Sequence, residues 1–279
     1  MTEEQPATVQ QVCELVGMTR SNFYKHRKHR KRREVDEALI LELTHRERSV
    51  QPCLGHRKLL HLIQPDLAEA GVKIGRDRFR DLLFRYELLI ERRVKNCCTT
   101  NSWHGFGVYP NVLKAIEITG PNQAWVSDIT YIRTDAGFVY LALITDVYSR
   151  AILGWDCSDS LEAQGALRAL EMALKTLPAG CKPPIHHSDR GSQYCCSGYV
   201  ELLRSSGFTI SMTEANHCYE NAQAERVNGI LKQEYGLGST LRDVAEARRM
   251  SRQAIDLYNY RRPHLALSMS FPMTVHQAA

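Results

Sequence analysis

The sequence predicts an α/β protein in which a mixed sheet flanked by helices follows an all-helical, basic front region. Two observations predict it. From about residue 121 onward, short runs of β-branched and aromatic residues alternate with amphipathic helical segments. Before residue 96 the apolar residues recur at helical spacing, and Gly-containing turns separate the helices. At 279 residues the chain is long enough for one core domain plus small modules.

Composition excludes several classes of protein. Hydrophobic residues make up 43% of the chain and charged residues 24%, which excludes a disordered or fibrous protein. No run of about 18 apolar residues occurs, so we expect no membrane-spanning helix. The polar N-terminal segment is not typical of a secretory signal. The nine cysteines are scattered without a Cys-x-x-Cys pair, which predicts reduced thiols, no zinc site and a cytoplasmic location.

The positive charge is concentrated at the front of the chain. Residues 1–100 hold 20 Lys and Arg against 14 Asp and Glu, whereas residues 101–279 hold 16 against 17. Between Arg20 and Arg33 there are eight Lys and Arg and no acidic residue. This asymmetry indicates a front region that faces nucleic acid, attached to a nearly neutral body.

Residues 1–33 are expected to form a basic helix-turn-helix module. Thr8 is a plausible N-cap for a helix that Gly17 ends, and a second helix starts close to Ser21. Its candidate DNA contacts are Arg20, Lys25, Arg27 and Lys28. The alternative is a basic helical hairpin that contacts nothing.

Residues 34–95 read as a second helix-turn-helix-like module. A candidate recognition helix starts near Gly75, and its arginine density favours phosphate contact over simple solvation. The arginines of this helix that we predict to contact DNA are Arg76, Arg78 and Arg80. Residues 96–120 lack periodicity and are rich in Asn, Thr and Gly, so we interpret them as a linker.

Residues 121–279 are expected to form the α/β domain. Three consecutive strands come first, and further strands then alternate with helices. The expected strands are 124–132, 137–148, 151–157, 184–189 and 208–213. The expected helices are 161–177, 199–207, 221–235 and 242–262.

Three carboxylates are placed so that they could converge on one site. Asp128 lies within the first strand, Asp189 follows the fourth strand, and Glu225 lies one turn into a helix. Crowded carboxylates repel one another unless a cation binds them, and hard oxygen ligands favour Mg²⁺ or Mn²⁺. Two such ions about 4 Å apart can activate an attacking oxygen and stabilise a leaving oxygen in phosphoryl transfer. The alternative interpretation of each acid is an exposed surface charge without a catalytic role.

Four motifs, in this order along the chain, carry a resemblance to a known family. They are WVSDITYI at 125–132, HSDRGSQY at 187–194, NAQAE at 221–225 with LKQE at 231–234, and YNYRRPH at 258–264. The chain resembles DDE-type transposases with a retroviral-integrase-like core, and more closely the OrfB-type transposases of bacterial insertion sequences. The 35 residues between the second and third acids match the family's interval.

The resemblance implies a fold, a site and partners. The fold would be ribonuclease-H-like, a five-stranded mixed sheet with its first three strands antiparallel. Asp128, Asp189 and Glu225 would be the catalytic triad that holds Mg²⁺ or Mn²⁺, with two ions expected. The substrate would be double-stranded DNA, both element ends and target. A homo-oligomer on DNA and an OrfA-type protein or frameshifted fusion are further expectations.

Several polar residues beside the motifs have both a functional and a structural interpretation. Lys232 lies about two helical turns after Glu225 and could hold a phosphate, or it could be solvated. Arg190 could contact DNA, tune Asp189 or serve the fold. For His187 we favour a hydrogen-bonded strand end over a catalytic base. Arg261 and Arg262 could contact DNA or cap the preceding helix.

This chain departs from the usual pattern at Glu220, where Asp is usual, and at Arg226, where a small polar residue is common.

The function expected from the motifs and the resemblance is a magnesium-dependent transposase. It would cut element ends and join the freed 3′-hydroxyl to another phosphate, at the bacterial nucleoid. One alternative is a nuclease of the same fold without joining activity. Another is a DNA-binding repressor with an inactive core.

Overall fold

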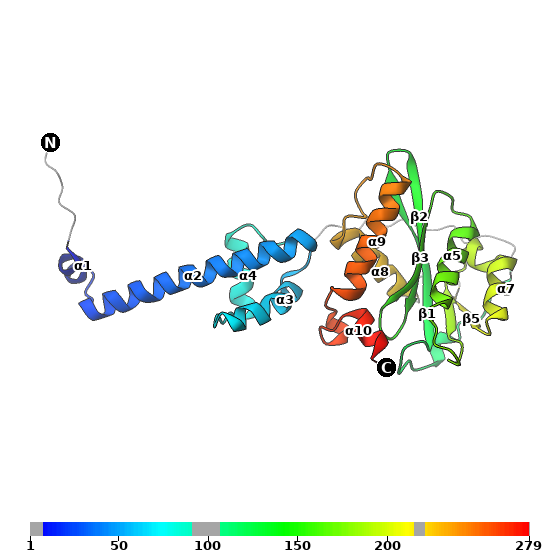
Figure 1. The fold of residues 1–279 in the computed structure, drawn as a ribbon, viewed down its shortest axis with the longest axis horizontal. Coiled ribbons are helices and arrows are strands. Elements are labelled where there is room, and N and C mark those ends of the chain that lie inside the picture. The colour runs from blue at the N-terminus through cyan, green and yellow to red at the C-terminus, as the bar shows by residue number, and fades with distance from the viewer. Residues whose placement is uncertain (1–7, 91–106, 215–220, 279) are drawn as a thin grey trace. The chain divides into compact units, whose positions relative to one another are not determined.

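The computed structural model describes residues 8–90, 107–214 and 221–278 and shows two compact units (Figure 1). The first, the helical unit, comprises residues 1–50 and 59–89. The second, the sheet unit, comprises residues 51–58 and 90–279. No helix within the described ranges is long and apolar enough to cross a membrane.

Four helices make up the front of the chain: α1 (Val9–Leu15), α2 (Arg20–Val50), α3 (His56–Glu69) and α4 (Arg76–Arg85). Thr8 caps α1 as predicted, in a capping box with Gln11. Gly17 has a φ of 65°, a left-handed conformation that favours glycine and allows the turn after α1.

Helix α2 runs without a break through residues 33 and 34, where the sequence suggests a boundary between two modules. Its 31 residues contain neither Gly nor Pro, so nothing in the local sequence ends the helix. Side chains from Tyr24 to Val35 are all exposed, and α2 begins to bury side chains only at Ile40. The apolar core of the helical unit is Ile40, Leu43, Leu59, Ile63, Leu67, Phe79, Leu82 and Leu83.

The expected linker, residues 96–120, lies partly outside the described residues, which resume at 107. Between 107 and 120 the only helix or strand described is the 3₁₀ turn η1 (Leu113–Ala115). Ser211 Oγ accepts a 3.1 Å hydrogen bond from the backbone N–H of Val112, which ties this stretch to the sheet.

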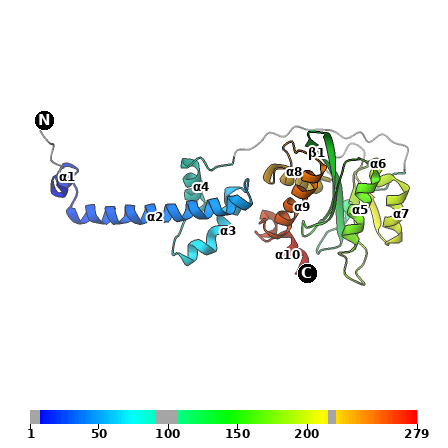
Figure 2. The same cartoon turned by 45° about the horizontal axis from the view of Figure 1, so that its top comes forward.

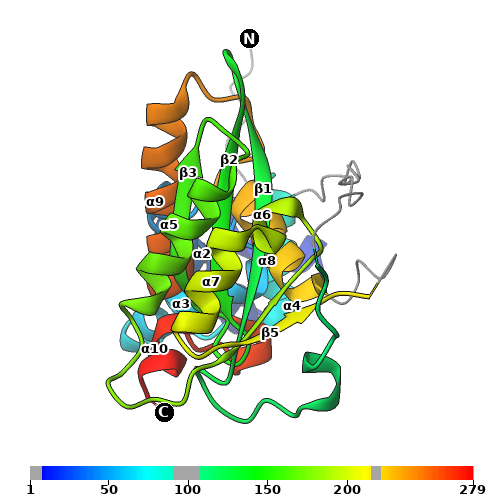
Figure 3. The ribbon, with the colours of Figure 1, turned by 90° about the vertical axis from the view of Figure 1, so that its right-hand side faces the viewer.

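The sheet has five strands in the order β3-β2-β1-β4-β5 (Figure 3). The first three strands form an antiparallel meander, and the last two run parallel to β1. This confirms the predicted mixed sheet. The strands are β1 (Ala124–Thr134), β2 (Gly137–Asp146), β3 (Ile152–Ser158), β4 (Ile185–Ser188) and β5 (Thr209–Met212).

Helices cover both faces of the sheet (Figure 2). On one face lie α5 (Ala163–Leu174), α6 (Ser192–Cys195) and α7 (Ser197–Ser205). On the other face lie α8 (Ala222–Glu234) and α9 (Val244–Tyr260). After α9 come the 3₁₀ turn η3 (Leu265–Leu267) and α10 (Pro272–Gln277). The sequence predicted the long helices and missed α6, η3 and α10, because segments of three to six residues show no periodicity.

Helix α5 packs unusually close to β3 at Gly154. A Cβ at that position would come within 2.0 Å of the carbonyl oxygen of Ala169. Only glycine therefore permits this helix–strand contact, which lies under the apolar layer that includes Trp125, Ile144 and Leu170.

Candidate active site

Asp128 lies in the middle of β1, opposite Leu143 of β2. The run around it is rich in β-branched residues and forms a central strand, so its carboxylate sits on a rigid backbone. Oδ1 accepts a 3.0 Å hydrogen bond from the backbone N–H of Ile129. Oδ2 accepts a 2.7 Å hydrogen bond from Nδ2 of Asn228, on α8. A hydrogen-bond donor therefore orients each of the two carboxylate oxygens of Asp128.

Asp189 directly follows β4. Because β4 runs parallel to β1, with His187 opposite Val126, the end of β4 delivers Asp189 toward Asp128. Oδ1 of Asp189 accepts a 2.9 Å hydrogen bond from the N–H of Gly191. A Cβ on Gly191 would lie 3.0 Å from that same oxygen, so glycine permits the tight turn that orients the acid.

Glu225 lies in the first turn of α8 and is exposed. Two amide side chains fix the start of this helix. Asn221 Nδ2 donates to the carbonyl oxygen of Ser127 at 3.1 Å, next to Asp128. Gln223 Nε2 donates to the carbonyl oxygen of Val147 at 3.0 Å. The helix that carries Glu225 is therefore tied both to β1 and to the turn between β2 and β3.

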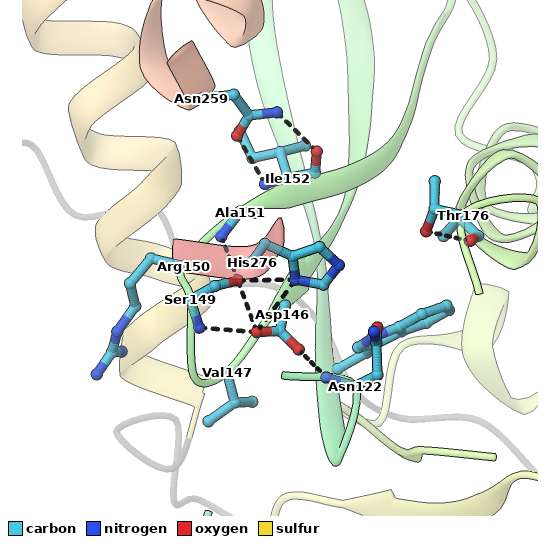
Figure 4. Close-up of polar contacts among 12 residues, drawn as sticks. Asn122, Asp146, Val147, Ser149, Arg150, Ala151, Ile152, Thr176, Asn259 and His276 are labelled. Carbon is cyan, nitrogen blue, oxygen red and sulfur yellow. Dashed lines mark hydrogen bonds and ion pairs between the residues drawn. The ribbon is translucent and has the colours of Figure 1, made fainter. Parts of the chain in front are cut away.

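The turn between β2 and β3 is itself held by a buried network (Figure 4). Asp146 Oδ1 accepts hydrogen bonds from the N–H and the Oγ–H of Ser149, both at 2.7 Å. Oδ2 accepts a 2.8 Å bond from the N–H of Asn122. Nδ1 of His276, from α10, lies 3.1 Å from Ser149 Oγ. Since the serine hydroxyl donates to the aspartate, this Ser, His and Asp set supports the turn and is not the arrangement of a nucleophile and its base.

The charges of the other two acids act on Asp128. Burial raises the pKa of Asp128 to about 7, and the charge of Asp189 adds to the rise. Glu225 raises the pKa of Asp128 as well, while hydrogen bonds to the carboxylate oppose the shift. The structure therefore brings the three predicted acids into one neighbourhood.

The donor chemistry of the site suits a hard divalent cation, because all three groups are carboxylates and two of them raise the pKa of the third. Among the residues that the structure describes, no set of three or more His, Cys, Asp or Glu side chains lies close enough to hold an ion. The three acids therefore lie near one another, but their side chains do not surround a common position for an ion.

Two further residues at the site were not singled out from the sequence. Asn228 follows Glu225 by three positions, and that one-turn spacing on α8 is a signal that could have found it. Tyr194 is 3% exposed, and its hydroxyl has no hydrogen-bond partner in the described residues. Burial and the nearby charge of Asp128 hold the pKa of Tyr194 well above its usual range.

The two histidines before Asp189 have structural positions. His186 Nε2 lies 2.6 Å from Ser127 Oγ and 2.9 Å from the hydroxyl of Tyr199, and burial lowers the pKa of His186 to about 3. His186 is therefore neutral. His187 is buried, with Nδ1 2.9 Å from Ser211 Oγ, which agrees with the hydrogen-bonded strand-end interpretation.

The predicted basic residues of the sheet unit have different positions. Lys232 is partly exposed on α8, on the face that carries Glu225. Arg190 donates through Nε to the carbonyl oxygen of Thr213 at 2.7 Å. Arg261 is exposed directly after α9.

Arg262 is only 2% exposed and forms two hydrogen bonds, at 2.7 and 2.8 Å, to the carboxylate of Glu234. Its guanidinium is part of the fold and has almost no surface to offer DNA. Of the two interpretations that the sequence left open, a structural role describes this arginine, although it pairs with a distant acid instead of capping α9.

The predicted DNA contacts of the helical unit are exposed. The four residues of α2 that were predicted to contact DNA are all exposed, so packing does not explain their positive charge. On α4, Arg78 is exposed, whereas Arg76 pairs with its neighbour Asp77 at 2.9 Å. The exposed basic side chains on these two helices are Arg20, Lys25, Arg27, Lys28, Arg76, Arg78 and Arg80.

Comparisons with known proteins match nearly the whole chain. Two family models, both described as integrase core domain, match residues 118–218 and 206–272. A 31 kDa protein of insertion element IS600 from Shigella sonnei, described as uncharacterized, is 37% identical over 94% of this chain and 96% of its own length. A transposase for insertion sequence element IS629 from the same species is 34% identical over 70% of this chain and 66% of its own length.

Solved structures of similar fold include the catalytic core domain of the HTLV-2 integrase in complex with magnesium. It is 19% identical, with a TM-score of 0.45, and the match covers 56% of this chain and 97% of that one. A simian T-cell lymphotropic virus intasome structure matches with 16% identity and a TM-score of 0.47, over 81% of this chain and 71% of that one.

Proposed function

Because the chain belongs to the family of insertion-sequence transposases with an integrase core domain, we propose that it cuts DNA strands at the ends of a mobile element and joins the freed 3′-hydroxyls to target phosphates. The observation that carries this proposal is the placement of the three acids: Asp189 ends the strand that runs parallel to the strand of Asp128, and hydrogen bonds from Asn221 and Asn228 tie the helix of Glu225 to that same strand. Three carboxylates gathered in this way favour a bound cation.

Asp128, Asp189 and Glu225 would hold the metal ions in this proposal. Two bound Mg²⁺ or Mn²⁺ ions would supply Lewis acidity to the attacking and leaving oxygens. The protein contributes the orientation of the acids: a strand for Asp128, a glycine turn for Asp189, and the tied start of α8 for Glu225. Asn228 keeps the Asp128 carboxylate in one rotamer through its 2.7 Å hydrogen bond.

The exposed basic side chains of α2 and α4 would contact DNA phosphates and select the element ends. Lys232, Arg190 and Arg261 would contact DNA near the site, whereas buried Arg262 is left out of this proposal. We further propose double-stranded DNA as the partner, a homo-oligomer that pairs two ends, and an OrfA-type protein or fusion as a helper. The protein would act at the nucleoid in the bacterial cytoplasm.

Strand transfer with labelled element-end DNA tests the proposal. Asp128→Asn, Asp189→Asn and Glu225→Gln should each abolish cutting and joining while leaving folding and end binding intact. Glu201→Gln is a matched control, because Glu201 is an exposed acid on α7, on the other side of the sheet. Joining that persists in the three variants would overturn the proposal.

The same assay separates the two alternatives. A nuclease of this fold releases cut products and never yields joined ones. A repressor with an inactive core binds ends and shows no Mg²⁺-dependent turnover with wild-type protein. Either outcome would contradict strand transfer as the function of the chain.

A further inference from the structure

The side of helix α8 that faces away from its buried residues is exposed or half-buried, and a half-buried glycine interrupts its row of polar side chains. The buried side of the helix is formed by Ala224, Val227, Asn228, Ile230 and Leu231. The opposite side carries Glu225, Arg226, Gly229, Lys232 and Gln233, a spacing that follows the turns of the helix. Four long polar side chains thus stand on both sides of a residue with no side chain at all.

Within the described residues, the fold provides no reason for glycine at position 229. The residue lies in the interior of α8 and is absent from the glycines with positive φ, so its backbone does not require glycine. A Cβ at this place would meet no atom within 4 Å in the described part of the chain. Gly154 is the contrast, because there a Cβ would strike the backbone of α5. Glycine inside a helix is less stable than alanine, so Gly229 weakens α8 without serving the packing.

We infer that the sugar–phosphate backbone of the reacting DNA strand crosses α8 at Gly229, in van der Waals contact with the bare helix backbone. This inference rests on the proposed function and adds the place where DNA seats beside the acids. Glycine is the residue that lets a ligand approach a protein backbone most closely.

The neighbours of Gly229 fit a phosphate strand. The Cα atoms of Glu225 and Lys232 are separated by seven residues, about 10 Å along the helix axis. A strand between them would have the carboxylate site on one side and the ammonium group of Lys232 on the other, while Arg226 adds a second positive charge on the Glu225 side. The backbone N–H groups inside the helix are bonded within it, so these side chains would supply the charge and Gly229 would supply the space.

A methyl group at position 229 should therefore move the DNA strand away from the acids. Misplacement of about 1 Å can cost about 10²-fold in rate. We expect Gly229→Ala to lower strand transfer about 10- to 100-fold and Gly229→Leu to lower it further. The same Gly229→Ala change should raise the Tm by about 2–4 °C, because it removes the helix penalty. A variant that is more stable and less active cannot owe its loss to misfolding.

Gly198→Ala is the matched control. Gly198 is an exposed glycine in the first turn of α7, and a Cβ there would make only an ordinary 3.9 Å contact with Leu167. This variant should join DNA at the wild-type rate. Equal joining by wild type, Gly229→Ala and Gly229→Leu would overturn the inference.

A footprint without chemistry separates this inference from the proposed function. With Ca²⁺ in place of Mg²⁺, hydroxyl-radical cleavage of bound end DNA should show sugars protected near the cut in wild type and Gly198→Ala, and exposed in Gly229→Leu. Protection that is absent in wild type, or kept in Gly229→Leu, contradicts the seating of DNA on α8. Wild-type protein that shows this protection but joins nothing refutes the proposed function and leaves the inference standing.

Discussion

Asn228 donates a 2.7 Å hydrogen bond from Nδ2 to Oδ2 of Asp128, although the two residues are 100 positions apart in the chain. The amide is buried, and it joins the helix that carries Glu225 to the strand that carries Asp128. One hydrogen bond therefore couples the positions of two of the three acids.

Asn228→Ala should weaken metal binding and so raise the Mg²⁺ concentration that the reaction requires. Without the amide, the Asp128 carboxylate loses a donor that fixes its rotamer, and partners of metal ligands are typically worth about 10- to 100-fold in affinity or activity. The Mg²⁺ concentration that gives half-maximal joining should rise accordingly. Glu201→Gln, at an exposed position of α7 on the other side of the sheet, is the control and should leave it unchanged. An unchanged Mg²⁺ requirement in Asn228→Ala would show that the hydrogen bond does not orient the acid.

Gln223→Ala should slow the reaction with little effect on stability. Gln223 ties the start of α8 to the β2–β3 turn through the carbonyl oxygens of Asp146 and Val147. A hydrogen bond of this kind contributes about 1 kcal/mol to stability. Its loss, however, frees the first turn of α8, which carries Glu225. We expect about a 10-fold lower rate of joining and a urea midpoint close to that of wild type. A wild-type rate would show that Asn221 alone positions the helix.

Breaking the Glu234–Arg262 pair should destabilise the protein strongly above pH 4.5. Glu234→Gln leaves the buried Arg262 guanidinium without its counter-charge, which typically costs about 3–5 kcal/mol of unfolding free energy. Burial raises the pKa of Glu234, but hydrogen bonds and charge from Arg262 and Lys58 outweigh it, and the net pKa lies below the ordinary value of 4.5.

The sign of the pH dependence follows from that lowered pKa. The stabilisation by Glu234 is present above pH 4.5 and is lost as the pH falls through the lower pKa of the folded state. Urea unfolding should therefore show a large deficit for Glu234→Gln at pH 7, and the deficit should shrink under more acidic conditions. A deficit that stays constant with pH would mean that the charge of Glu234 is not what stabilises the fold.

Tyr194→Phe should stabilise the metal-free protein. The hydroxyl is buried without a hydrogen-bond partner among the described residues, and an unsatisfied polar group of this kind costs about 1–3 kcal/mol. Removing the oxygen keeps the ring contact with Tyr199, whose centroid lies 5.4 Å away. Urea unfolding in EDTA should give a higher unfolding free energy for the variant. A lower one would show that the hydroxyl is bonded in solution.

The sequence by itself predicted the five strands and the long helices of the sheet unit, and it singled out the three acids as candidates for the site. Runs of β-branched residues and helical periodicity are local properties of the sequence. Asp128, Asp189 and Glu225 lie in motifs that can be recognised along the chain without a structure. The sequence predicted a module boundary between residues 33 and 34, whereas α2 is continuous over residues 20–50, a stretch without Gly or Pro.

Only the tertiary structure decided which polar groups are buried and with whom they pair. Arg262 looks the same in sequence whether it faces DNA or Glu234, and its pairing depends on how α8 packs beside the end of α9. Asn228 and Tyr194 acquire their places at the site in the same way, since burial and electrostatic coupling arise between segments that are distant along the chain. Recognising Gly229 required both the sequence and the tertiary structure. The sequence shows that it lies within a helix, and only the folded structure shows the open space around it.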